Sequence, residues 1–203
     1  MGKLHRVGIL GGTFDPVHQG HEHLARQGAD CTDLDVVVWL PTRHPPHKKQ
    51  IIASYEDRCA MIEAAIAPTP EFELLRLPPT TAGYGIDLWL AVHQRYPHSQ
   101  YYWILGWDSF ASLPYWYQRQ ALIPKVTWLV APRCAPKDTW PSPPQVIEQF
   151  HQQNLPVRWQ LLAIAPRAIS ATAIRQAYQD GSHPPGLNQR VRQYIRDRGL
   201  YRA

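Results

Sequence analysis

The decisive stretch of this chain reads Gly11-Gly12-Thr13-Phe14-Asp15-Pro16-Val17-His18-Gln19-Gly20-His21. It follows the apolar run Val7-Gly8-Ile9-Leu10, which is typical of a buried parallel strand. The glycine pair ends that strand. Because glycine has no Cβ atom, the backbone there can approach a ligand closely. The sequence therefore predicts a strand that leads directly into a ligand-binding turn.

Two histidines follow this turn. His18 and His21 are three residues apart, which places both rings on one face of the first turn of a helix. The start of a helix carries free N–H groups and partial positive charge, so it favours anions. Open α/β sheets bind ligands at the carboxyl ends of their strands. The stretch thus predicts a donor-rich pocket for phosphate groups.

Strand-like and helix-like runs alternate along the whole chain. Strands are expected at Val7–Leu10, Leu34–Leu40, Glu71–Leu75, Tyr101–Leu105, Val126–Val130 and Val157–Ala163. Helices are expected at about His18–Gln27, Tyr55–Ala67, Ile86–Arg95, Val146–Gln153, Ala171–Tyr178 and Asn188–Arg198. Such alternation indicates an α/β fold with a Rossmann-like, doubly wound parallel sheet. With 203 residues, no repeat and no linker, we expect a single domain over 1–203 with the last two helices at its end.

Composition excludes several classes of protein. A hydrophobic content of 44% and a charged content of 18% are globular values. No apolar run approaches the roughly 20 residues that span a bilayer. The first residues run straight into the first strand, so no secretory signal is expected. The three cysteines lack C-x-x-C spacing, which favours a reducing, cytoplasmic setting without a zinc or disulfide framework.

The formal net charge of +5 indicates an anionic partner, either nucleic acid or a phosphorylated small molecule. A basic run of Arg43, His44, His47, Lys48 and Lys49 and the eight tryptophans leave nucleic acid open. The double proline within that run and the placement of the motifs favour the small molecule. The tryptophans also suggest an aromatic surface and self-association into a homo-oligomer.

The three histidines His18, His21 and His23 could suggest a zinc site. His23 falls on another face of the helix from His21, and no carboxylate or cysteine completes a ligand set. We therefore expect no protein-held metal.

A second motif lies near the end of the chain and reads Ile169-Ser170-Ala171-Thr172-Ala173-Ile174-Arg175. Ser170 is a good N-cap, so a helix begins there. Its amides and the hydroxyls of Ser170 and Thr172 can hold phosphate oxygens, and Arg175 can return to the same anion with two hydrogen bonds. Taken alone, the motif favours an ordinary capped helix that carries a solvated arginine.

Together the two motifs resemble the nucleotidyltransferase family whose signature is His-x-Gly-His. Further stretches resemble one branch, the bacterial-type nicotinate-nucleotide adenylyltransferases. These stretches are Pro45-Pro46-His47-Lys48, Gly106-Trp107-Asp108-Ser109, Leu113-Pro114-Tyr115-Trp116, Val130-Ala131-Pro132-Arg133, Val191-Arg192-Gln193-Tyr194-Ile195 and Gly199-Leu200-Tyr201. The resemblance covers almost the whole chain in order.

The resemblance implies three sets of site residues. The catalytic residues would be His18, His21 and Arg175. ATP would contact Gly11, Gly12, Thr13, Phe14, His18, His21, Gly106, Asp108, Ile169, Ser170, Thr172 and Arg175. The acceptor would contact His47, Lys48, Tyr84, Asp108, Trp116 and Arg133. Residue types alone also allow Trp116 to be a core residue and Asp108 to cap the following helix.

The implied reaction transfers AMP from ATP, carried with Mg²⁺, to nicotinate mononucleotide, which yields nicotinate adenine dinucleotide and pyrophosphate in NAD biosynthesis. Nicotinamide mononucleotide and phosphopantetheine remain alternative acceptors, cytidylyl transfer a related reaction, and a nucleotide-binding regulator the non-enzyme alternative. One departure stands out. The family usually reads Ser-Tyr-Thr where this chain has Gly83-Tyr84-Gly85, so a hydroxyl expected beside the pyridine carboxylate is missing.

Overall fold

One parallel sheet organises the protein. The computed structural model describes residues 4–43, 51–132, 142–165, 169–182 and 184–202. Its strands are β1 (Arg6–Gly12), β2 (Val36–Pro41), β3 (Phe72–Leu74), β4 (Gln100–Gly106), β5 (Thr127–Ala131) and β6 (Arg158–Leu161). They pair in the order β3-β2-β1-β4-β5-β6, every pair parallel. The order reverses between β1 and β4, which is where doubly wound sheets bind ligands. The expected fold is confirmed.

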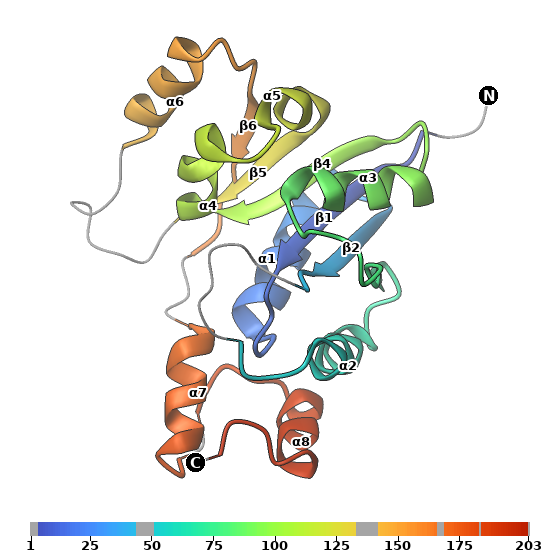
Figure 1. Ribbon diagram of the computed structural model, residues 1–203, viewed down its shortest axis with the longest axis vertical. Coiled ribbons are helices and arrows are strands. Elements are labelled where there is room, and N and C mark those ends of the chain that lie inside the picture. Colours follow the sequence, from blue (N-terminus) through green and yellow to red (C-terminus); the bar gives the residue numbers. More distant parts are fainter. Residues whose placement is uncertain (1–3, 44–50, 133–141, 166–168, 183, 203) are drawn as a thin grey trace.

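Helices connect the strands and cover both faces of the sheet (Figure 1). They are α1 (Gln19–Thr32), α2 (Tyr55–Ile66), α3 (Gly85–Arg95), α4 (Trp107–Ser112), α5 (Arg119–Leu122), α6 (Pro143–Gln152), α7 (Ala171–Gln179) and α8 (Gln189–Asp197). All six expected helices and all six expected strands form, with shifted ends. The short helices α4 and α5 and the 3₁₀ turns Leu113–Tyr115 and Ile123–Lys125 were not predicted.

Two apolar cores lie on opposite faces of the sheet. Successive strand residues alternate between them, so Trp103 and Leu105 of β4 belong to one core and Ile104 to the other. The first core includes side chains from α3, α4 and α6, and the second includes side chains from α1, α2, α7 and α8. Burial on both faces explains why the strands read as nearly continuous apolar runs.

The tryptophans correct one expectation. Trp39 is buried in the second core, and the first core holds Trp89, Trp103, Trp107 and Trp128. Trp116 and Trp159 are partly buried against the first core. Trp140 lies outside the described residues. Most of these indoles therefore fill the interior, where a large aromatic ring buries much apolar area. For the described tryptophans the expected exposed surface was wrong, so these residues give no support to self-association, which stays a prediction.

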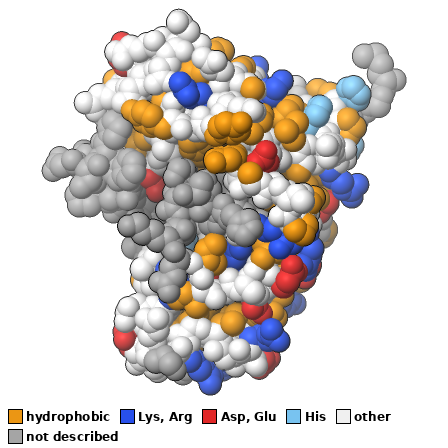
Figure 2. All heavy atoms as spheres, in the orientation of Figure 1, with side chains coloured by type: hydrophobic (Ala, Val, Ile, Leu, Met, Phe, Trp, Pro, Cys, Tyr) orange, Lys and Arg blue, Asp and Glu red, His pale blue; other side chains and the backbone are white. Residues whose placement is uncertain are grey.

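The described surface in Figure 2 shows basic and acidic side chains interspersed, without one continuous basic stripe on this face. Residues 44–50, which carry most of the basic run, lie outside the described residues. Among the helices of the described ranges, none is both long and apolar enough to cross a bilayer.

A buried carboxylate ties α2 to α8. Asp57, only 7% exposed, accepts hydrogen bonds from Ser54 Oγ (2.6 Å), Tyr194 Oη (2.9 Å) and Arg198 Nε (3.2 Å). Burial acts to raise the pKa of Asp57. The hydrogen bonds from Ser54 and Tyr194 and the charge of Arg198 outweigh it and hold this pKa below its usual value.

Asp57→Asn is expected to lower the free energy of unfolding by about 1.5–3 kcal/mol at pH 7, because it removes the charge that these bonds engage. Since the folded pKa of Asp57 is depressed, the stabilisation is present above the unfolded pKa and is lost as pH falls through the folded pKa. Thermal unfolding should therefore separate wild type and variant by several degrees at pH 7 and by less in acid. Asp180→Asn, at an exposed helix end, is the matched control; an equal loss there would contradict the assignment.

Candidate active site

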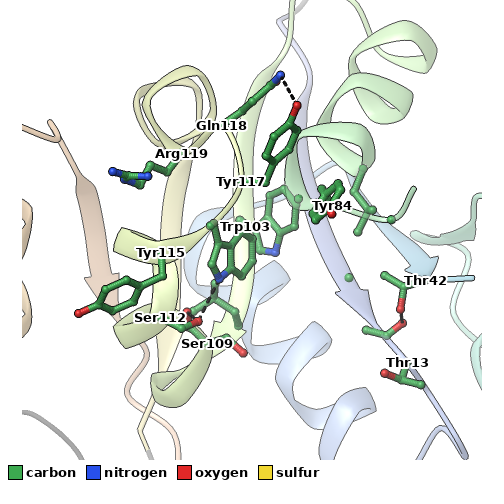
Figure 3. Close-up of a pocket in the computed structure, with 17 residues that line it drawn as sticks. Thr13, Thr42, Tyr84, Trp103, Ser109, Ser112, Tyr115, Tyr117, Gln118 and Arg119 are labelled. Atoms are coloured by element: carbon green, nitrogen blue, oxygen red, sulfur yellow. Dashed lines mark hydrogen bonds between the residues drawn. The ribbon is translucent and has the colours of Figure 1, made fainter. Parts of the chain in front are cut away.

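A cleft opens at the carboxyl ends of β1 and β4, with a volume of about 640 Å³ (Figure 3). The end of β1 and the residues after β2 form one side of it, and α3, α4 and the turn before α5 form the other. Its lining residues are Gly11, Gly12, Thr13, Thr42, Gly83, Tyr84, Gly85, Leu88, Trp103, Leu105, Ser109, Ser112, Tyr115, Trp116, Tyr117, Gln118 and Arg119. Five of the expected site residues thus meet here: Gly11, Gly12, Thr13, Tyr84 and Trp116.

The glycine pair at the end of β1 has packing reasons as well as the expected ligand reason. A Cβ atom at Gly11 would come within 2.7 Å of Leu88 Cδ2, and one at Gly12 would come within 3.0 Å of the Phe14 ring. Real Cβ atoms almost never come as close as the first distance, and few come as close as the second, so a larger residue would require the side chain of Leu88 or Phe14 to shift. Because Gly11 and Gly12 have no side chain, they leave space for a ligand where they line the cleft.

The expected histidine pair forms at the start of α1. His18 is the N-cap, and its ring stacks on that of His21 with centroids 3.7 Å apart. The backbone N–H of His18 donates to Nδ1 of His21 (3.2 Å). A neutral imidazole whose Nδ1 accepts carries its proton on Nε2. His21 therefore carries its N–H at Nε2. In the first turn of α1, the backbone N–H of Gln19 donates to the oxygen of Gly186 (2.8 Å) and that of His21 to the oxygen of His18 (2.8 Å).

Neighbouring residues hold this pair in place. A Cβ at Gly20 would lie 2.9 Å from Nδ1 of His18, which explains the glycine between the histidines. Phe14 is 2% exposed and packs its ring edge-on to His21, with centroids 4.9 Å apart. The Phe14 side chain therefore helps to fix the orientation of the His21 ring. Since this side chain is buried, only the backbone of Phe14 is available for the expected contact with ATP.

The second motif meets the first. Ser170 is the N-cap of α7, and its Oγ accepts from the N–H of Ala173 (3.2 Å), as expected. Ile169 lies against Gly20, 3.9 Å from the place of a Cβ there, and fills the space left by Gly186. The start of α7 is thereby joined to the start of α1, although 149 positions separate Gly20 from Ile169 (169 − 20).

Arg175 behaves differently from the expectation of a two-pronged grip on an anion. Its Nη1 donates to the backbone oxygen of Asp15 (2.7 Å), and its Nη2 lies 3.4 Å from Thr172 Oγ1. One arm thus anchors the loop before His18. The remaining donors of the guanidinium are the ones that a phosphate can use.

Trp116 lines the cleft, and its position explains why residue 85 is glycine where the family usually has threonine. Its Nε1 donates to Ser112 Oγ (2.9 Å), and its ring packs edge-on to Trp103 and Trp128. A Cβ at Gly85 would come within 2.6 Å of the Trp116 ring, so the indole occupies the space where relatives are expected to carry threonine. Trp116 is therefore both a partly buried residue and part of the cleft wall.

Other expected residues lie beside the cleft or outside the described ranges. Gly106 is the N-cap of α4 and Asp108 lies in the first turn of that helix, so Asp108 is not the N-cap residue. Neither is among the lining residues, although their neighbour Ser109 is. His47, Lys48 and Arg133 lie outside the described residues.

Sequence reasoning missed part of the wall. Ser112, Tyr115, Tyr117 and Gln118 line the cleft from the segment that joins α4 to α5. Figure 3 shows Gln118 hydrogen-bonded to Tyr117 and the Arg119 side chain directed away from the other labelled residues. These residues lie in or directly beside the motif Leu113-Pro114-Tyr115-Trp116. Their closeness to that motif in the sequence was the signal that could have predicted them as cleft residues.

The donor set of the site suits anions. It consists of imidazole rings, a guanidinium, hydroxyls and helix-start amides. In the described ranges no group of three His, Cys, Asp or Glu residues could hold a metal ion.

Comparison with known proteins agrees with this geometry. The family model described as cytidylyltransferase-like matches residues 9–177. The chain belongs to that family. A relative from Synechococcus sp. (strain JA-2-3B'a(2-13)) is 38% identical, over 95% of this chain and 96% of its own. One from Trichormus variabilis is 33% identical over 98% of each. Both are named probable nicotinate-nucleotide adenylyltransferase, which confirms the branch that the motifs resemble.

A solved structure confirms the fold. The nicotinic acid mononucleotide adenylyltransferase of Plasmodium falciparum, complexed with NaAD, superimposes with a TM-score of 0.77 at 16% identity and covers 97% of each chain.

Proposed function

We propose that this protein transfers AMP from ATP to nicotinate mononucleotide and releases nicotinate adenine dinucleotide and pyrophosphate. The observation that carries the proposal is the stacked His18–His21 pair at the start of α1, beside a cleft walled by Trp116. The pair supplies donors for a triphosphate, and the cleft supplies an aromatic wall for a pyridine ring. The names of the relatives support the same reaction.

ATP would lie over Gly11 and Gly12. Its triphosphate would then lie between the His18–His21 pair and the start of α7, where Ser170, Thr172 and the remaining N–H donors of Arg175 can bind it. Backbone N–H groups of Thr13 and Phe14 complete the nucleotide side. Such preorganised donors stabilise the charge that grows on the phosphoryl oxygens in the transition state.

The acceptor would lie along Tyr84 and Trp116, with its phosphate held by Arg133 and by His47 and Lys48. A phosphate monoester is largely ionised at neutral pH, because its second pKa is about 6. It can therefore attack the α-phosphorus without a general base. Catalysis then consists of positioning and charge stabilisation.

Mg²⁺ would enter with ATP. The ion keeps several waters and is bound mainly through substrate phosphates in sites of this kind, and when bound it neutralises the leaving pyrophosphate. The donors described above are suited to the phosphates rather than to the cation. We further propose that the enzyme works in the cytoplasm, where the thiols of Cys31 and Cys59 stay reduced.

Pyrophosphate release tests this function against its alternatives. With ATP, we expect rapid release with nicotinate mononucleotide, slower release with nicotinamide mononucleotide and none with phosphopantetheine. Replacing ATP by CTP should abolish the reaction. Tight ATP binding without release for any acceptor would instead identify a nucleotide-binding regulator.

A further inference from the structure

A buried arginine lies beneath the cleft and has no part in the chemistry above. Arg58 is in α2, and only 1% of its surface is exposed. Desolvation of a guanidinium is costly, so a buried one needs strong hydrogen bonds. Burial lowers the pKa of Arg58, and the nearby charge of Asp15 opposes that change.

The hydrogen bonds of Arg58 join two segments that lie next to each other on one side of the cleft. Its Nη1 donates to the backbone oxygen of Thr13 (2.6 Å), in the loop after β1, and to that of Thr42 (2.8 Å), in the segment after β2. Its Nη2 lies 3.5 Å from the oxygen of Arg43. Thr13 and Thr42 both line the cleft, and Figure 3 shows them side by side at its edge.

A second buried group holds the same loop from the end of the chain. Asp15 is 2% exposed and accepts from the hydroxyl of Tyr201 (2.7 Å) and from the N–H groups of Ile52 and Ala53. Tyr201 is 3% exposed. Because Arg175 donates to the backbone oxygen of Asp15, the loop before His18 is fixed on several sides at once.

We infer that Arg58 and Tyr201 are positioning residues that hold the loop after β1 and the segment after β2 at a fixed separation. The first loop carries Thr13 and leads to His18, and the second carries Thr42, which lines the same cleft. This inference rests on the proposed function, in which both substrates lie in that cleft. The two residues thus set the distance between the two substrates. They touch neither substrate.

The variant Arg58→Lys tests whether the position of the hydrogen-bond donors matters when the positive charge is kept. Lysine keeps the positive charge, but its Nζ lies one bond short of the place of Nη1, so it cannot keep both bonds to Thr13 and Thr42. Each substrate still has its own binding residues in this variant, so the binding of either substrate alone should change little. A misplacement of about 1 Å between reacting groups can cost about 10²-fold in rate. We therefore expect kcat to fall by about 10- to 100-fold, while KM for each substrate changes by less than about threefold.

Calorimetry gives a readout that does not depend on turnover. The product nicotinate adenine dinucleotide spans both loops with a fixed covalent length, whereas ATP contacts chiefly one. Arg58→Lys should weaken product binding by about tenfold and leave ATP binding nearly unchanged. A merely structural role would reduce the active fraction and leave the affinities of the folded molecules alike. Arg76→Lys is the matched control, since Arg76 is an exposed arginine paired with Glu56 and Glu63.

Three outcomes decide the question. Wild-type kcat and product affinity in folded Arg58→Lys would overturn the inference. If that variant does not fold, Tyr201→Phe decides, because it removes one hydroxyl: a smaller but similar loss of kcat and product affinity supports the inference, and wild-type values overturn it. Wild-type protein that neither forms nor binds the dinucleotide would instead refute the proposed function.

Discussion

His21→Ala is expected to lower kcat by about 10²–10³-fold and to weaken ATP binding much less. Removing one preorganised donor from a developing negative charge typically has that effect on rate. His21 offers such a donor at Nε2, because its Nδ1 accepts from the backbone of His18. Single-turnover kinetics and a separate measurement of ATP affinity would resolve the two effects.

His23→Ala is the control for this variant, since it removes an imidazole two residues further along α1. We expect near wild-type turnover from it. Near wild-type turnover in folded His21→Ala would remove the histidine pair from the mechanism.

Arg133→Ala is expected to raise KM for the mononucleotide by about 10- to 100-fold, with a smaller change in kcat. The acceptor phosphate stays charged throughout the reaction, so its arginine contributes uniform binding. A charge-assisted hydrogen bond contributes about 1.5–3 kcal/mol, which corresponds to that range. Initial-rate kinetics at saturating ATP measure it.

The comparison variant is Arg95→Ala, which removes an exposed arginine paired with Glu73. Its KM values should match those of wild type. A fall in ATP affinity in Arg133→Ala, with an unchanged acceptor KM, would mean that Arg133 belongs to the nucleotide side.

Local patterns were sufficient to predict the sheet and its helices. The central strands are short runs that are buried on both faces, as in Trp103-Ile104-Leu105, where Gly106 marks the strand end. The edge strands β3 and β6 are more exposed. The helices α4 and α5 were missed because they have only 6 and 4 residues, too short for a helical period to be visible.

Site contacts between residues close together in the sequence could be predicted. Contacts between residues far apart in the sequence could not. The His18–His21 pair and the Ser170 cap follow from spacing within a single turn of helix. The bonds from Arg58 to Thr13 and from Tyr201 to Asp15 join residues 45 and 186 positions apart, and no local pattern indicates them. The packing of Trp116 on Gly85 is of the same kind.

The ratio of kcat/KM for nicotinate and nicotinamide mononucleotides tests the central claim most directly. The two acceptors differ only in carboxylate against amide, so donors around the ring must discriminate. Gly83 and Gly85 line the cleft and their backbone N–H groups suit a carboxylate, whereas the N–H of Tyr84 already donates to Asp87 Oδ2 (3.1 Å). The net charge of +5 also favours the more anionic acceptor. We predict a clear preference for the nicotinate form, reduced by the missing hydroxyl at Gly85. Equal values, or a preference for the nicotinamide form, would contradict it.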